Sequence, residues 1–448
     1  MILTLLPSSW KKTSMVLGEI ALALAAGVWA YSIYPFHLQL LESTRVPFGG
    51  FYIDGLSATV SLTAILVGML VLPASNRLKE SSWQFDFALL LGVAGTIALS
   101  SSTNAFLIVA GWGLVAVSSY SMVSLAGDRG SLTGSIKYAF MSALSFQFLV
   151  VSIFLIISST SDFKILTLGM ILFLVALGFK GGIPPFHMWL PDVYGYSDPV
   201  PVSMLSSTMK LGALALAIRL LDLSALALPI AYGKILVILL VILSIGAMLV
   251  GNLGGLTQSE VQRMMAYSSI AHVGYMVMAL AVFTASLIYG VPQAEYYALV
   301  GLLIYFASYA LSKAGVFAFI KGAMHSSRLT LQSMEGLGSA SPLLSGSLLV
   351  ILLNLIGVPP LLGFWGKLFI FASAANQSIT LFFIWGFPWF TLVAIANSAL
   401  SVFYYIRVMR SIYLPGKATG NFKYLSPAIL SSLGLIILGV LLPLLLSV

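Results

Sequence analysis

Residues 178–189 read GFKGGIPPFHMW, and residues 356–367 read IGVPPLLGFWGK. Each stretch places a Gly-x-Pro-Pro sequence and a nearby lysine inside a long apolar segment. Two consecutive prolines interrupt a helix, because the ring clashes with the preceding turn and proline lacks an N–H donor. Backbone carbonyls freed in this way are tolerated at membrane depth only where they are buried or line a wet cavity. One such break could equally be a structural kink, but paired interruptions in two halves of a chain indicate the working site of a transporter.

The composition around these breaks is that of a membrane protein. The chain has 448 residues, of which 60% are hydrophobic and 8% charged, and its mean hydropathy is +1.05. A soluble domain carries roughly a quarter charged residues, so a cytosolic enzyme, a disordered protein and a nucleic-acid-binding protein are excluded. Segments such as Leu435–Leu446 lack the alternation of barrel strands. We therefore predict an all-α polytopic membrane protein, without cysteine and hence without disulfides or thiolate metal sites.

Thirteen hydrophobic spans are predicted, and the loops between them are too short to hold a soluble domain. The spans lie near residues 14–34, 54–74, 84–102, 104–126, 134–158, 165–190, 198–221, 232–253, 262–286, 296–321, 342–374, 380–410 and 424–446.

Charge placement predicts the orientation of the chain. Of the 21 basic residues, thirteen fall on the side of the N-terminus, four on the opposite side and four inside spans. Lys and Arg are enriched in cytoplasmic loops. We therefore expect a cytoplasmic N-terminus and, with an odd number of spans, a C-terminus outside.

The four basic residues inside spans are candidates for function: Lys180, Lys210, Lys313 and Lys367. A lysine at the centre of a membrane helix costs about 2.5–3.5 kcal/mol on insertion scales, so four cost on the order of 10 kcal/mol. Desolvation makes a buried lysine easier to deprotonate, which suits a proton relay. The alternative is that the side chain reaches an interface, and it is credible for Lys313, which lies eight residues from Lys321.

Other polar groups accompany the lysines. His187 follows the first Pro-Pro pair, and His272 lies in an otherwise apolar span. A lone helical histidine is more often a hydrogen-bonded structural residue than a ligand, but either one could bridge water between lysines. Asn397 and Tyr405 add polar groups to the twelfth span, either for packing or for a hydrated path. The spacing of metal-binding histidines is absent, so no metal site is predicted.

Several motifs, in one order along the chain, resemble the antiporter-like membrane subunits of respiratory complex I, and the N-type subunit most of all. They are residues 178–194 followed by 199–202 and Lys210, RMMAYSSIAHVGY at 263–275, GVPP at 357–360 with 363–367, and residues 397–398 with 404–407. The stretches DGLS at 54–57 and SIKY at 135–138 match more weakly.

The resemblance implies a subunit of the proton-translocating arm of a quinone oxidoreductase in a multi-pass energy-transducing membrane, the prokaryotic plasma membrane. It implies two inverted five-helix repeats, each with a broken helix, around a hydrated axis. We place them at residues 81–225 and 226–412, between N-terminal helices (1–80) and a C-terminal helix (413–448). Redox chemistry, with quinone, flavin and iron–sulfur clusters, would belong to partner subunits. The expected partners are a small membrane subunit and a second antiporter-like subunit.

Residue roles follow from the same resemblance. Lys180 matches the lysine that accepts protons, Lys210 the lysine that passes them inward, and Lys367 the lysine that connects to the exit. His187 and His272 match polar residues near the axis. The matched motifs also contain three supporting candidates: Tyr194, Asn397 and Tyr405.

Two departures from the family matter. The family usually has a glutamate after the residue matching Trp112, where this chain has Gly113, and no other acid is expected in mid-membrane. Lys180 would then take a carboxylate from a neighbouring subunit, stay mostly neutral, or belong to a subunit that pumps poorly. The family also typically has fourteen spans, so with thirteen predicted here we expect the first one to be missing.

Two alternative functions stay open. The first is a subunit of a multisubunit cation/proton antiporter or of a membrane-bound hydrogenase, which share the fold. The second is a non-pumping structural subunit of the membrane arm, which Gly113 favours.

Overall fold

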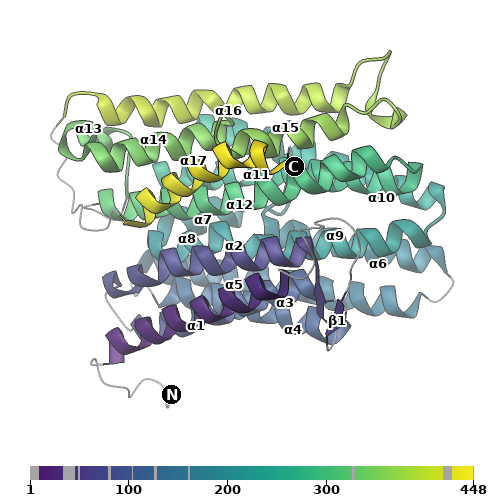
Figure 1. Cartoon of the computed structure of the whole chain (residues 1–448), viewed down its shortest axis with the longest axis horizontal. Helices are drawn as coiled ribbons and strands as arrows, with labels where there is room; N and C mark the ends of the chain where they lie inside the picture. Colours follow the sequence, from purple (N-terminus) through teal and green to yellow (C-terminus); the bar gives the residue numbers. More distant parts are fainter. Residues whose placement is uncertain are drawn as a thin grey trace.

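The computed structural model describes residues 10–33, 46–48, 51–78, 82–102, 104–125, 129–159, 162–324, 328–416 and 426–446. Nearly all of this part of the chain is helical (Figure 1). The elements are α1 (Trp10–Ile33), β1 (Val46–Phe48), β2 (Phe51–Ile53), α2 (Gly55–Val71), η3 (Leu72–Arg77), α3 (Ser82–Ser101), α4 (Ala105–Ser124), α5 (Arg129–Ser158), α6 (Phe163–Gly181), α7 (Trp189–Tyr196), α8 (Pro199–Ser207), α9 (Met209–Ala227), α10 (Ile230–Leu256), α11 (Val261–Tyr289), α12 (Pro292–Ala323), η4 (Gln332–Met334), α13 (Leu337–Ala340), α14 (Pro342–Ile356), α15 (Leu362–Ala374), η5 (Thr380–Phe382), α16 (Trp389–Tyr413) and α17 (Ser426–Leu446). The two short strands pair antiparallel.

The predicted helical membrane class is confirmed, but the count of thirteen spans is not. The described residues contain 11 helices long and apolar enough to cross a membrane, or up to 12 if one bent pair of helices counts as a span. The segment read as a single span at 342–374 consists of two helices, α14 and α15, because the second Pro-Pro pair separates them. The apolar helix Leu362–Ala374, with 13 residues, falls below the length of a complete crossing.

Both predicted breaks are present, and a glycine ends the helix at each one. Gly182 follows α6 with φ +70°, and Gly357 follows α14 with φ +93°. This left-handed backbone suits glycine because it has no Cβ. Each Pro-Pro pair follows within a few residues and carries a cis peptide bond. The chain therefore leaves each helix at a defined point and exposes its last carbonyls to neighbouring side chains.

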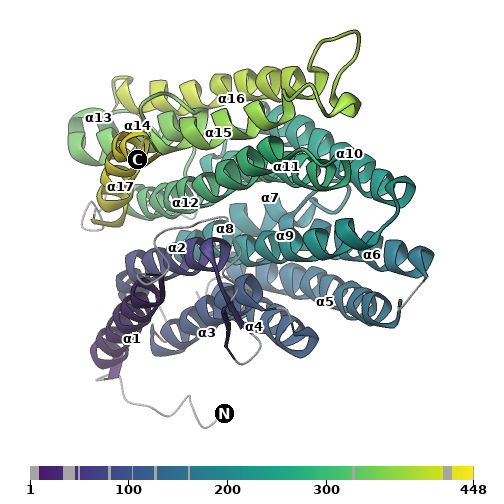
Figure 2. The same cartoon turned by 45° about the vertical axis from the view of Figure 1, so that its right-hand side comes forward.

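The helices lie side by side, with α1–α5 toward one side of the bundle and α13–α17 toward the other (Figures 1 and 2). Between them run α9, α11 and α12, whose side chains are almost completely buried. The packing of α10 against α11 is close: a Cβ added at Gly251 would lie 2.4 Å from the backbone nitrogen of Ala271. Small residues allow such approach between membrane helices. Polar groups in the middle of α11 and α12, such as His272 and Lys313, are therefore enclosed by protein.

Ion pairs join residues that the charge pattern puts on one side of the membrane. Arg219 pairs with Asp54, both on the predicted outer side, at 2.9 Å. Lys137 and Arg263, both on the predicted cytoplasmic side, pair with Asp192 at 2.6 Å each. If the number of predicted spans between two partners were wrong by one, the prediction would place the partners on opposite sides of the membrane. The pairs thus support the predicted sides of the membrane for the loops between residues 54 and 263.

Candidate functional site

Lys180 occupies the last turn of α6, next to the first break, and its side chain is buried. Its Nζ donates a hydrogen bond to the hydroxyl of Tyr138 on α5 at 3.3 Å. The ring of Tyr138 packs on Trp189, with centroids 4.8 Å apart, and Trp189 donates to the carbonyl of Phe179 at 3.2 Å. The two halves of the broken helix thus hold the tyrosine that contacts Lys180.

Lys210 lies on α9 and reaches the same break from the other side. Its Nζ donates to the carbonyl of Gly181 at 3.3 Å and lies 5.4 Å from the ring centre of Tyr194. The carbonyl of Gly181 belongs to the residue after Lys180, so the Lys210 side chain contacts the helix end that carries Lys180. Tyr194 is fully buried, and its hydroxyl has no hydrogen-bond partner among the described residues.

Lys313 lies in the interior of α12 and is 0% exposed. Its Nζ donates to the carbonyl of Met265 at 3.0 Å and to the hydroxyl of Ser268 at 2.8 Å, both on α11. The possibility that this lysine reaches an interface is therefore wrong. The side chain points across to α11 because α12 runs through the middle of the bundle, with protein on all sides.

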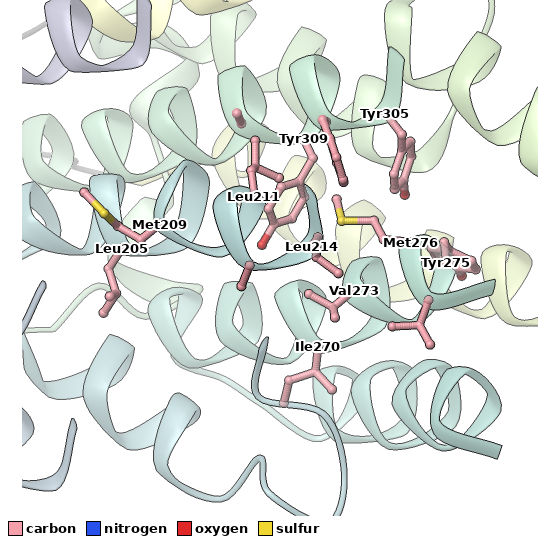
Figure 3. Close-up of a cluster of buried hydrophobic side chains, with 14 of the residues drawn as sticks. Leu205, Met209, Leu211, Leu214, Ile270, Val273, Tyr275, Met276, Tyr305 and Tyr309 are labelled. Atoms are coloured by element: carbon pink, nitrogen blue, oxygen red, sulfur yellow. The ribbon is translucent and has the colours of Figure 1, made fainter. Parts of the chain in front are cut away.

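His272 lies one turn beyond Ser268 on α11 and sits between two tyrosines. Its Nε2 is 2.9 Å from the hydroxyl of Tyr405 on α16, and its Nδ1 is 2.5 Å from the hydroxyl of Tyr305 on α12. The hydroxyl of Tyr405 also lies 2.5 Å from that of Ser268. Figure 3 shows Tyr305 and Tyr309 of α12 among apolar side chains of α8, α9 and α11. The polar groups here are thus enclosed in an apolar core.

Lys367 lies on α15 at the second break. Its Nζ donates to the carbonyls of Leu355 and Ile356, at 2.9 and 2.8 Å, and to the hydroxyl of Ser398 at 2.9 Å. The two carbonyls belong to the last turn of α14, where the break leaves them without helical donors. Three acceptors match the three N–H groups of an ammonium ion, so this geometry suits a charged lysine held by the break itself.

Within the described part of the chain, none of these four lysines takes part in an ion pair. The five ion pairs found there use other basic residues, such as Lys137, Arg219 and Lys321. Asp192, outside the candidate spans, holds two of them. Partial burial would raise its pKa, but the hydrogen bonds and charges of Lys137 and Arg263 outweigh burial and keep the pKa below the ordinary value. The carboxylates of these five pairs, Asp54, Asp192, Asp198 and Glu260, thus pair with basic residues other than the four lysines.

The remaining predicted residues lie less centrally. His187 is half-buried at the first break, and its Nδ1 has no hydrogen-bond partner among the described residues. Asn397 accepts hydrogen bonds from Asn252 on α10, which supports a packing role. A Cβ at Gly113 would touch only a ring carbon of Phe146, at 3.5 Å. There is therefore space for a side chain at position 113, although the residue there is glycine.

Sequence reasoning missed several residues of this region. Tyr138, Ser268 and Tyr305 contact the lysines or the histidine directly, yet serine and tyrosine are too common in membrane helices to stand out. Asp86, near the start of α3, is a buried acid, 2% exposed, that the sequence analysis did not single out. It accepts a hydrogen bond from Ser14 at 2.8 Å. The signal that could have revealed it is an acid four residues inside an apolar helix.

Comparisons with known proteins place the chain among membrane subunits of one family. Residues 102–393 match the family model described as "NADH:quinone oxidoreductase/Mrp antiporter, TM". The chain is 30% identical over 416 residues to NADH-quinone oxidoreductase subunit 14 of Thermus thermophilus, covering 91% of this chain and 85% of that protein. It is 27% identical over 486 residues to NADH-quinone oxidoreductase subunit N 1 of Solibacter usitatus, covering 98% and 91%.

Solved structures show the same fold. A chain of respiratory complex I from Thermus thermophilus with bound aureothin superposes with a TM-score of 0.76 and 27% identity, covering 98% of both chains. A chain of the Mrp complex from a Dietzia species superposes with a TM-score of 0.80, covering 98% of this chain and 91% of that one. At 17% identity, the second likeness concerns the fold alone.

Proposed function

The chain belongs to the family of transmembrane subunits shared by NADH:quinone oxidoreductases and Mrp antiporters, and from this premise we propose that it is the N-type, proton-translocating subunit of a complex I-like membrane arm. The observation that carries the proposal is the row of four buried lysines that lack carboxylate partners in the described part of the chain. Such lysines are costly in a membrane. A lysine without a fixed counter-ion can release and take up a proton more readily than a salt-bridged one.

The arrangement of the lysines supports a path along the bundle. Lys180 lies beside the first break and Lys210 contacts it, Lys313 lies in the central helix α12, and Lys367 lies at the second break. The path would run from the first repeat (81–225) to the second (226–412), which we propose are inverted relative to each other. We also propose a cytoplasmic N-terminus and an outer C-terminus, in line with the charge bias.

The chain would work as one part of a multisubunit membrane assembly, as its relatives do. We propose a small membrane subunit and a second antiporter-like subunit as neighbours. Flavin, iron–sulfur clusters and the quinone site would belong to other subunits, since this chain has no cysteine. Its own contribution would be to hold and move protons when the redox subunits drive a conformational or electrostatic change.

Two alternatives have specific support. An antiporter subunit has the same fold, as the Mrp likeness shows, but the relatives named above, at 27–30% identity, are NADH-quinone oxidoreductase subunits. Co-purification of flavin and iron–sulfur proteins with this chain would support the oxidoreductase, and co-purification of antiporter-like subunits only would contradict it.

The second alternative is a structural subunit that does not pump protons, and Gly113 favours it. Proton pumping by a Lys180 variant distinguishes this alternative from the proposed function.

Replacing Lys180 by alanine is expected to reduce redox-driven proton pumping in membrane vesicles while the assembly stays intact on native gels. A positioned proton donor or acceptor typically contributes 10²–10⁴-fold to a proton transfer, so the loss should be about 100-fold in the transfer step. Lys164→Ala is the matched control, because Lys164 begins the same helix and is exposed. Unchanged pumping in Lys180→Ala would mean that this subunit is chiefly a scaffold.

Replacing Tyr138 by phenylalanine removes the one hydrogen bond that the Lys180 side chain makes to the residues described, but keeps the ring on Trp189. A hydrogen bond to a charged group is worth about 1.5–3 kcal/mol, or roughly 10- to 100-fold. We expect a smaller pumping loss than in Lys180→Ala, measured in the same vesicles. Tyr120→Phe on α4, a half-buried residue, is the control. Pumping by Tyr138→Phe equal to that of Tyr120→Phe would show that the hydrogen bond to Lys180 has no part in proton transfer.

A further inference from the structure

The central helices contain an unbroken chain of hydrogen bonds between a lysine and a histidine. Lys313 Nζ lies 2.8 Å from Ser268 Oγ, Ser268 Oγ lies 2.5 Å from Tyr405 Oη, and Tyr405 Oη lies 2.9 Å from His272 Nε2. On its far side, His272 Nδ1 contacts Tyr305 Oη at 2.5 Å. All five side chains are at most 2% exposed. At these separations the atoms touch directly, so no water fits between them.

We propose that Ser268 is a proton-carrying residue, and that protons pass between Lys313 and His272 through the hydroxyls of Ser268 and Tyr405 by direct contact. The proposal deepens the proposed function and rests on it. It adds the hydroxyl groups of Ser268 and Tyr405 to the proposed path, where they connect Lys313 to His272. Ser268 is the critical link, because it is the residue that contacts both Lys313 and Tyr405.

The transfer balances without any further reactant. The Lys313 ammonium gives a proton to Ser268 Oγ, Ser268 gives its own hydroxyl proton to Tyr405 Oη, and Tyr405 gives its hydroxyl proton to His272 Nε2. Lys313 ends neutral, His272 ends as imidazolium, and both hydroxyls keep one proton each. The imidazolium then donates through both nitrogens, with Nε2–H directed at Tyr405 Oη and Nδ1–H at Tyr305 Oη. Rotation of the two hydroxyls restores the starting orientation.

The neighbouring positions show that this geometry is specific. Ser269 is equally buried, but its hydroxyl donates to the carbonyl of Met265 on its own helix, at 2.9 Å. Tyr404 is equally buried, but its hydroxyl donates to Asn252 at 3.2 Å, away from the histidine. Each proton-carrying residue thus has an adjacent residue of the same type whose hydroxyl donates to a different acceptor. Tyr404 packs on Tyr405, with ring centroids 4.4 Å apart, and the carbonyl that accepts from Ser269 also accepts from Lys313. Substitutions at Ser269 and Tyr404 therefore report the effect of disturbed packing next to the hydrogen-bonded chain.

The experiment compares Ser268→Ala with Ser269→Ala, and Tyr405→Phe with Tyr404→Phe, in the complete assembly. Proton translocation per electron is measured in vesicles, together with the solvent deuterium isotope effect on pumping and assembly on native gels. We expect a loss of at least about tenfold in Ser268→Ala and in Tyr405→Phe, with little change in the two controls. Ser268→Thr keeps a hydroxyl and is expected to restore most of the pumping.

The outcomes separate this inference from the proposed function. If Lys210→Met stops pumping but Ser268→Ala pumps like wild type, the inference is overturned and the proposed function stands. If Ser268→Ala and Ser269→Ala lose pumping equally, Ser268 acts through packing, and the inference is again overturned. If Lys210→Met itself pumps normally, the proposed function fails first. Loss in Ser268→Ala and Tyr405→Phe, rescued by Ser268→Thr, supports the inference.

Discussion

Replacing Lys210 by methionine should stop proton pumping more completely than any other single substitution considered above. Methionine keeps most of the volume and the unbranched shape of the lysine but cannot carry a proton. Lys210 is the side chain of α9 that contacts the first break, through the carbonyl of Gly181. It stands in the proposed path between the first break and Lys313 on α12, so its loss should interrupt the path before the second repeat. Loss of a positioned proton carrier costs about 10²–10⁴-fold.

The measurement is proton translocation per electron in vesicles that contain the whole assembly, with quinone reduction followed in parallel. Electron transfer is expected to continue or slow, while proton translocation through this subunit falls below detection. Lys234→Met is the control, because Lys234 lies near the start of α10 with an exposed side chain. Normal pumping by Lys210→Met in an intact assembly would argue that protons bypass α9, and it would favour the structural alternative.

Replacing Arg219 by alanine should destabilise the chain more than any loss of a surface ion pair. Two guanidinium nitrogens donate to the two carboxylate oxygens of Asp54, both at 2.9 Å, and Nε donates to the carbonyl of Ser100 at 2.6 Å. Asp54 also caps α2 through its bond from Ser57 N. One arginine therefore ties together α9, the start of α2 and the end of α3.

The expected size follows from burial. Breaking a fully buried pair costs about 3–5 kcal/mol, but the Asp54 side chain is 24% exposed, so we expect about 2–3 kcal/mol. The effect is measured as thermal unfolding of the detergent-solubilised assembly, scored by release of this subunit. Arg219→Lys should recover part of the loss, because lysine keeps the charge without the two-pronged geometry.

Arg328→Ala provides the comparison for this second substitution. Its ion pair with Glu260 involves an arginine side chain that is 48% exposed, and such surface pairs contribute about 0–1 kcal/mol. Equal destabilisation by Arg219→Ala and Arg328→Ala would contradict the assignment of Arg219 as the residue that ties the three helices together.

Local chemistry explains why so much could be predicted from the sequence. Helical spans follow from composition, because a chain this apolar must satisfy its backbone inside helices. The breaks follow from Gly182 and Gly357 beside their proline pairs, because proline and left-handed glycine act on their own turn of chain. The burial of Lys180, Lys210 and Lys367 follows from their positions within apolar runs. None of these conclusions depends on which helices are neighbours.

Contacts between distant residues could not be predicted in the same way. Ser268 and Tyr405 are 137 residues apart, and Arg219 and Asp54 are 165 apart. A hydrogen bond needs atoms within about 3 Å, whereas one residue of register shifts a helix by 1.5 Å and turns it by 100°. The number of helices that cross the membrane completely was also hard to predict, because it depends on where helices bend or break. Residues 342–374, for example, form two helices, α14 and α15.

The sequence by itself determined that the chain is a helical membrane protein with two broken segments and four lysines in apolar surroundings. These properties depend on the solvation and the backbone preferences of each residue where it stands. Only the tertiary structure decided that Lys313 faces Ser268, that Tyr405 joins Ser268 to His272, and that Tyr138 contacts Lys180. The physical reason is that hydrogen bonding is short-ranged and directional, so its partners are chosen by the rotation and register of packed helices.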